Sequence, residues 1–120
     1  MCAYKIELLN QTLNGRIFRC SICNKIHIEY KNLNFNFSNE EYEYFKDYFF
    51  KLEPEKWEIK NRNTCFCRKV MVPIGHRNFN VMFHTSEIYE LKNLLNYSKY
   101  GNETLRLIKL CNIELKLSLN

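Results

Sequence analysis

The sequence predicts a single small α+β domain over residues 1–120, built from two ββα repeats, each with two antiparallel strands and one helix. Three observations lead to this fold class. The length fits one domain, two stretches alternate between apolar and polar residues before a helix-like segment, and these stretches resemble each other. We place repeat one at about 16–52, repeat two at about 65–97, and a C-terminal strand or helix extension at 103–119.

The repeat emerges when residues 23–49 are set beside residues 67–95. Each stretch opens with Cys-x-Lys, continues through two strand-like segments, and ends in a helix-like segment. Two common ββα patterns that happen to look alike are the alternative, but the matched identities favour duplication. At one constant offset the following residues coincide: Asn32 with Asn78, Asn34 with Asn80, Phe37 with Phe83, Glu41 with Glu87, and Lys46 with Lys92.

Repeat one contains two strands and a capped helix. A strand at residues 16–20 precedes it, Ile26 and Ile28 alternate in its first strand, and "NLNFNF" forms its second strand. Ser38 followed by Glu41 is a capping box, which predicts the start of a helix. One apolar stripe then follows the helical period, formed by Tyr42, Phe45, Phe49 and Leu52.

Repeat two follows a polar linker at residues 51–64, which we expect Trp57 and Ile59 to attach to the core. Alternation in "VMV" and in "NFNVMF" predicts a second hairpin, with Gly75 available for a positive φ in the turn. Thr85 is the expected N-cap of the last helix. The apolar stripe of that helix is formed by Ile88, Leu91 and Leu95.

The composition is that of a folded protein without a membrane segment. Hydrophobic residues make up 46% of the chain, and only 3 Gly and 2 Pro argue against a linker or a disordered chain. The start, "MCAYKIELLNQ", does not read as a signal peptide, and no run approaches about 18 apolar residues. We therefore expect a cytoplasmic protein, in which six cysteines are free thiols or metal ligands.

The charges are unevenly distributed around a formal net charge of +5. Seven of the 13 acids lie from Glu40 to Glu58, whereas residues 8–28 and 59–86 contain none, and both cysteine pairs fall in these acid-free stretches. Chance and a solvated surface are one interpretation, and a nucleic-acid-binding surface is the other. On the second interpretation the contacting residues are Arg16, Arg19, Lys25, Lys60, Arg62, Arg68, Lys69 and Arg77.

Two cysteine pairs are candidate metal ligands. Cys20 and Cys23 have the C-x-x-C spacing of a zinc knuckle, in which a tight turn brings both sulfurs to one tetrahedral ion. Cys65 and Cys67 occupy the matching place before the first strand of repeat two, and side chains two apart in an extended strand share a face. A pseudo-twofold arrangement would bring all four thiolates to one structural Zn²⁺, whose negative cluster nearby Arg and Lys would offset.

Other assignments of these thiols stay open at this level. Reduced, semi-buried cysteines without metal are the main alternative. A thioredoxin-like redox pair fits less well, because this C-x-x-C precedes a strand and not a helix, and iron–sulfur ligation has no supporting spacing. We expect His27 on the strand's outer face and Cys111 in the core. The residues that can replace a member of the second pair are His27, His76, His84 and Cys2.

The segments "MCAYK", "NG-IFRC-IC-KI", "NLNFNFS-EE", "RKV-VPIG" and "SE-YELKNLL" occur in this order. In this they resemble a small family of unknown function found in Bacteroidota. The resemblance runs from about Met1 to Tyr97. It implies a cytoplasmic bacterial protein in which the C-x-x-C is a family feature, and it implies no catalytic residues.

We predict a non-enzymatic binding or adaptor module with a structural zinc site and an unidentified protein partner. No Ser or Cys nucleophile stands at a known catalytic spacing from a histidine. The alternative is a basic nucleic-acid- or ribosome-associated protein, and an enzyme or redox protein that uses Cys20 and Cys23 ranks third. The oligomeric state does not follow from the sequence.

Overall fold

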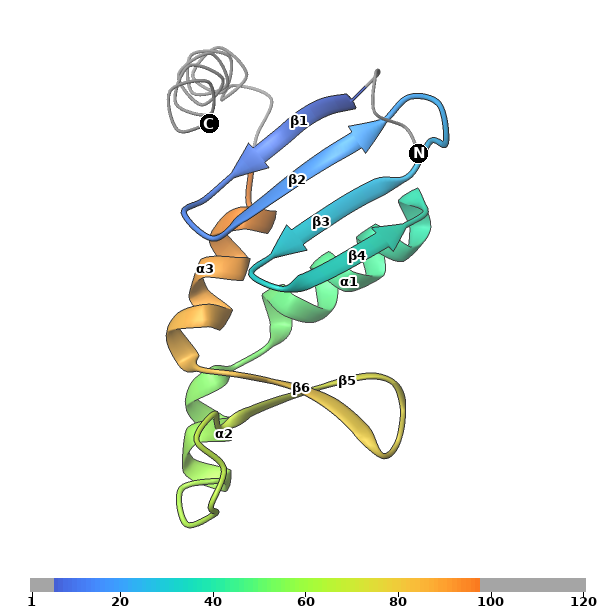
Figure 1. Ribbon diagram of the computed structural model, residues 1–120. Coiled ribbons are helices and arrows are strands. Elements are labelled where there is room, and N and C mark those ends of the chain that lie inside the picture. The colour runs from blue at the N-terminus through green and yellow to red at the C-terminus, as the bar shows by residue number, and fades with distance from the viewer. Residues whose placement is uncertain (1–5, 98–120) are drawn as a thin grey trace.

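A four-stranded antiparallel sheet, a separate two-stranded hairpin and three helices form this small α+β domain (Figure 1). The computed structural model describes residues 6–97. In the larger sheet the strand order is β1-β2-β3-β4, so each strand pairs with its neighbour in the chain. The predicted α+β class is confirmed. The elements are β1 (Ile6–Gln11), β2 (Gly15–Cys20), β3 (Ile26–Tyr30), β4 (Leu33–Phe37), α1 (Asn39–Lys51), α2 (Pro54–Lys60), β5 (Val70–His76), β6 (Phe79–Phe83) and α3 (Thr85–Leu95).

One face of the four-stranded sheet carries the core. Ile17 in β2 lies opposite Ile28 in β3, and Ile26 and Tyr30 flank Ile28 at alternate positions. All four side chains are buried, because α1 and α3 lie across this face (Figure 1). The period-two alternation of the sequence therefore determines which face of the sheet is covered.

An aromatic cluster joins the sheet to the hairpin β5–β6. The ring centroids of Phe35 in β4 and Phe45 in α1 are 4.9 Å apart, and those of Phe45 and Phe49 are 4.6 Å apart. Phe49 also packs edge-on against Phe83 at the base of the hairpin, with 6.1 Å between centroids. Tilted and edge-on ring contacts stabilise beyond the area they bury. The hairpin thus shares the core of the larger sheet at its base.

The predicted helices are present, with one correction. The Glu41 backbone N–H donates to Ser38 Oγ at 3.2 Å and the Ser38 N–H donates to Glu41 Oε1 at 2.9 Å, which completes the predicted capping box. The N-cap of α3 is His84 and not Thr85, because the Thr85 hydroxyl donates to Glu58 Oε1 of α2 at 2.7 Å. Both apolar stripes face the core as predicted, through Tyr42, Phe45, Phe49, Leu52, Ile88, Leu91 and Leu95.

Other parts of the fold differ from the prediction or extend it. β1 was not predicted, and the expected linker contains α2. Trp57 packs against the core as predicted, but Ile59 is 65% exposed, because residues two apart lie on different faces of a helix. The predicted extension 103–119, with Cys111, and Cys2 lie outside the described residues. Within residues 6–97, none of the helices has the length and apolarity needed to span a membrane.

A buried carboxylate on α3 connects three segments. Glu87, only 6% exposed, accepts a hydrogen bond from Lys31 Nζ in the β3–β4 turn at 2.6 Å. It also accepts one from Arg68 Nε at 3.0 Å and one from the His84 backbone N–H at 2.7 Å. Burial raises the pKa of this carboxyl, but the hydrogen bonds from His84, Lys31 and Arg68 outweigh burial and lower the pKa to about 2.

Replacing Glu87 with Gln should therefore remove a pH-dependent part of the stability. The carboxyl has a lower pKa when folded than the ordinary 4.5, so its stabilisation is present above about pH 4.5 and is lost as the pH falls toward 2. We expect Glu87→Gln to lower the free energy of unfolding by up to about 3 kcal/mol at pH 7, and the difference to shrink toward pH 2. Urea unfolding followed by circular dichroism from pH 2 to 7 measures both.

The matched control is Glu43→Gln, which removes an exposed carboxylate of α1 paired only with Lys46 at 3.6 Å. Such a surface pair contributes about 0–1 kcal/mol, so this variant should follow the wild-type pH curve. Wild-type and Glu87→Gln curves that stay parallel down to pH 2 would contradict the assigned role of Glu87.

Candidate metal centre

The connection between β2 and β3 is a tight turn, which we call the knuckle, and two hydrogen bonds donated by backbone N–H groups close it. The Cys20 N–H donates to the Lys25 carbonyl at 3.0 Å, and the Cys23 N–H donates to Cys20 Sγ at 3.4 Å. Asn24 has φ 55, a left-handed conformation that Asn tolerates better than most residues. This turn brings the backbone N–H of Cys23 and the sulfur of Cys20 together, so both cysteines lie at the same place.

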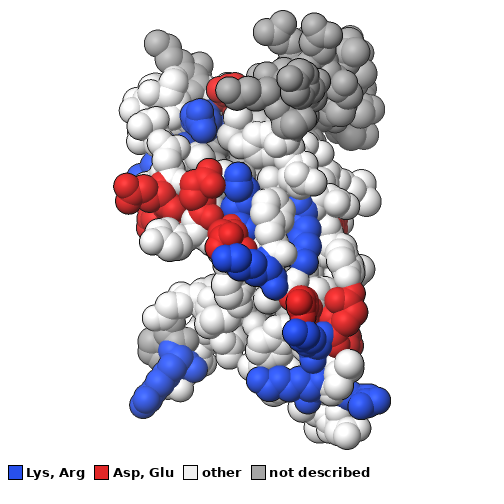
Figure 2. All heavy atoms as spheres, turned by 180° about the vertical axis from the view of Figure 1, so that it is seen from behind, with Lys and Arg blue, Asp and Glu red and all other residues white. Residues whose placement is uncertain are grey.

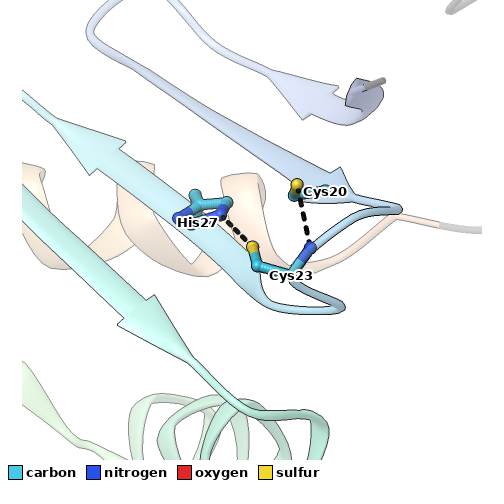
Figure 3. A group of neighbouring side chains, drawn as sticks. All are labelled: Cys20, Cys23 and His27. Atoms are coloured by element: carbon cyan, nitrogen blue, oxygen red, sulfur yellow. Dashed lines mark hydrogen bonds between the residues drawn. The ribbon is translucent and has the colours of Figure 1, made fainter. Parts of the chain in front are cut away.

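Three side chains converge at this knuckle (Figure 3). The ligand atoms of Cys20, Cys23 and His27 all lie within 4.8 Å of one another. Cys23 Sγ is 3.6 Å from His27 Nε2. Ligand atoms on a tetrahedral zinc, with bonds of about 2.3 Å to sulfur and 2.0 Å to nitrogen, lie roughly 3.5–3.8 Å apart. The separation of Cys23 Sγ and His27 Nε2 therefore already fits a shared zinc ion, and all three ligand atoms lie within 4.8 Å of one another.

His27 is held with one nitrogen aimed at the sulfurs. Its Nδ1 lies 2.6 Å from Asn36 Oδ1 on β4. Asn36 uses its Nδ2 to donate to Asn34 Oδ1 at 2.7 Å, so its own Oδ1 faces the imidazole as an acceptor. Nδ1 then carries the proton, and the Nε2 lone pair is directed at Cys23. The Phe18 ring stacks on the imidazole, with centroids 5.0 Å apart and planes at 25°.

This arrangement resembles that of a metal-binding histidine with a supporting second residue. Metal-binding histidines commonly donate their other ring N–H to an oxygen that fixes the tautomer and the ring orientation. Two thiols and one neutral imidazole form a donor set that suits Zn²⁺. Cys20 is buried and Cys23 is exposed, so the site is closed toward the sheet and open toward solvent. Within residues 6–97, no fourth Cys, His, Asp or Glu joins this group.

Cys65 and Cys67 lie elsewhere in the described fold. Both are exposed, in the loop between α2 and β5, at the opposite end of the molecule from the knuckle (Figure 1). Asn61 Nδ2 holds that loop by donating to the Lys69 carbonyl at 2.7 Å. The pseudo-twofold meeting of four thiols expected from the repeat is not present in the structure. His27, predicted as an alternative ligand, stands with Cys20 and Cys23 instead.

The spacing of the third donor was present in the sequence. Cys20, Cys23 and His27 read C-x-x-C-x-x-x-H, which keeps all three donors within one turn and the strand that follows it. Alternation placed His27 on the outer face of β3, and that face holds the site. The two neighbours of His27 could not be predicted from the sequence, because Phe18 and Asn36 lie beside it only through strand pairing.

The basic residues of the nucleic-acid alternative are dispersed. Figure 2 shows Lys and Arg side chains in separate groups, interspersed with acidic ones. Arg16 pairs with Glu29 at 2.8 Å and Arg68 with Glu87 at 3.0 Å. Arg19 and Lys25 lie at the knuckle. Lys60, Arg62 and Lys69 lie at the end of α2 and in the loop that follows it, and Arg77 lies in the β5–β6 turn.

Comparison with known proteins assigns a family without an activity. Residues 1–120 match the family model described as a family of unknown function, DUF6686. The chain belongs to this family. The match to DUF6686 includes the last twenty or so residues, which the resemblance drawn from the sequence left out. No curated protein matches the chain, and no solved structure matches it.

The assigned orientation of His27 in this DUF6686 protein can be tested at Asn36. Asn36→Ala removes the acceptor that fixes the imidazole, so we expect zinc affinity to fall by about 10–100-fold. Competition with a chromophoric chelator measures this. Asn36→Asp keeps an acceptor oxygen and should bind at least as tightly as the wild type. An Ala variant with wild-type zinc affinity would contradict the assigned tautomer.

Proposed function

We propose that this protein is a non-enzymatic binding module of the bacterial cytoplasm, with a structural zinc ion held by Cys20, Cys23 and His27. The observation that carries the metal assignment is the convergence of three donors, one of them oriented by Asn36. An unoriented surface histidine beside two thiols would support much less. Here the imidazole is fixed on both sides, by a hydrogen bond and by a stacked ring.

The position of the ion suits a structural role. Cys20 ends β2, Cys23 lies in the connecting turn and His27 belongs to β3. Asn36, which supports His27, belongs to β4. One ion would thus connect the ends of neighbouring strands beside the hydrogen bonds that close the turn. Metal binding of this kind contributes directly to the folding free energy.

The binding role is supported by an exposed apolar hollow between α1 and the hairpin β5–β6, which we call the hairpin groove. It has a volume of about 740 Å³, within the range of roughly 300–1,000 Å³ found for ligand sites. Contiguous apolar patches that are exposed to water often mark binding surfaces. Its lining includes Phe37, Tyr44, Tyr48, Val72, Ile74 and Val81.

Metal content tests the zinc assignment. Protein purified without added zinc should carry one equivalent by native mass spectrometry, and Cys23→Ser or His27→Gln should lose it. We expect each of these variants to melt more than about 10 °C lower, because the loss of several kcal/mol of binding energy shifts a domain of this size by that amount. The double variant Cys65→Ser/Cys67→Ser is the matched control and should keep both zinc and melting temperature.

The control also separates this site from a four-cysteine site. Zinc lost from the Cys65→Ser/Cys67→Ser variant would favour four cysteines, and a wild type that is fully stable without metal would exclude a structural ion. Substitution by Co²⁺ then counts the thiolates, since each adds to the sulfur-to-metal charge-transfer absorption. Two thiolates match Cys20 and Cys23 with His27.

A further inference from the structure

The hairpin β5–β6 has an apolar face that extends beyond the core. Val70 pairs with Phe83 and Val72 with Val81, and alternation along β6 puts Phe79 on this same face farther out. The ladder is irregular between Pro73 and His76, and Ile74 there lines the same groove as Val72 and Val81. The inner residues Val70, Val72 and Phe83 are at most 5% exposed, whereas Ile74 is 44% and Phe79 57% exposed. The outer half of the hairpin face is therefore uncovered by residues 6–97.

The opposite wall of the hairpin groove is equally open. Tyr44 is 80% exposed and Tyr48 is 39% exposed, both on α1. Apolar side chains on both walls thus face a space that no described segment of the chain enters. A second surface with apolar side chains would be needed to remove them from water.

The α1 wall of the groove carries Asp47 and Lys51, with further acidic side chains beside it and a basic one in the hairpin turn. Glu40, Glu43 and Asp47 lie along α1 beside Tyr44, and Figure 2 shows this acidic group above a hollow, with a basic side chain at the hairpin end below it. Arg77 lies in the β5–β6 turn, where it is exposed. Asp47 pairs only with Lys51 on its own helix, and both side chains are more than 60% exposed, so the pair is weak and the carboxylate can accept a better partner.

We propose that the hairpin groove binds a second copy of this chain. In a twofold arrangement each hairpin places Ile74 and Phe79 in the groove of its partner, and each Arg77 lies against the partner's Asp47. A twofold interface requires a self-complementary surface. The groove and the hairpin turn beside it provide one, because the turn carries Arg77 next to apolar side chains and the α1 wall carries Asp47 next to apolar side chains. This inference rests on the proposed binding role and does not depend on the zinc.

Oligomeric state tests the proposal. Sedimentation velocity of the full chain should show a dimer at about 100 μM that dissociates on dilution. Phe79→Asp should be monomeric at the same concentration with an unchanged melting temperature, because Phe79 is exposed in the single chain. Ile74→Ser is the second variant in case the first does not fold. The matched control is Leu13→Asp, which changes a 94% exposed residue far from the groove and should remain dimeric.

A charge exchange tests the assigned contact. Arg77→Glu and Asp47→Lys should each weaken dimerisation by about tenfold or more, and the variant carrying both should recover to within about threefold of the wild type. A monomeric wild type, or a dimer unaffected by Phe79→Asp, overturns the proposal. A monomer that binds a synthetic Leu/Lys peptide but not its Leu/Glu counterpart would also overturn it and assign the groove to a foreign basic segment. Zinc content is measured on the same samples, so failure of the metal assignment is seen separately.

Discussion

The contacts of Glu87 determine how the separate parts of this fold are placed. One buried carboxylate on α3 accepts hydrogen bonds from the β3–β4 turn and from the loop before β5. Burying a charge is costly unless it is fully paired, and here Lys31 and Arg68 supply the pairs. Because Arg68 lies two residues before β5, this contact positions the base of the hairpin β5–β6. α3 also reaches the other side of the hairpin groove, where Lys92 Nζ donates to the carbonyl of Leu52 at the end of α1.

The candidate metal group and the Glu87 contacts lie at opposite ends of the same strand. β3 carries His27 near its start and ends at Tyr30, next to Lys31. Tyr30 is itself buried and donates from its hydroxyl to Glu90 of α3 at 2.8 Å. A strand of five residues is thus held at one end by α3 and, on the proposed function, at the other by an ion. Packing of Ile26 and Ile28 between these ends supplies the apolar part.

Local patterns were enough to predict most elements, but not where they lie. Alternation identified the hairpins, and the Ser38–Glu41 capping box identified α1. β1 was missed because a bulge between Leu8 and Asn10 breaks its alternation, and α2 because seven residues starting at Pro54 read as a linker. The internal repeat predicted two similar units, yet the first hairpin gains β1 and β2 as neighbours while the second packs beside helices. Two hairpins with similar sequences but different neighbours in the fold do not bring their cysteine pairs together about a pseudo-twofold axis.

The candidate metal site also depends on which segments become neighbours, and in addition on the register of the strands. His27 lies opposite Phe18 on β2 and Asn36 on β4, so the stacked ring and the fixed tautomer exist only in this pairing. A slip of β4 by one residue would turn Asn36 to the core face and bring an apolar side chain beside the imidazole. Zinc binding through an oriented His27 would therefore favour the native register over its neighbours. The other face of β4 selects the same register, because Phe35 and Phe37 pack against Phe45 of α1.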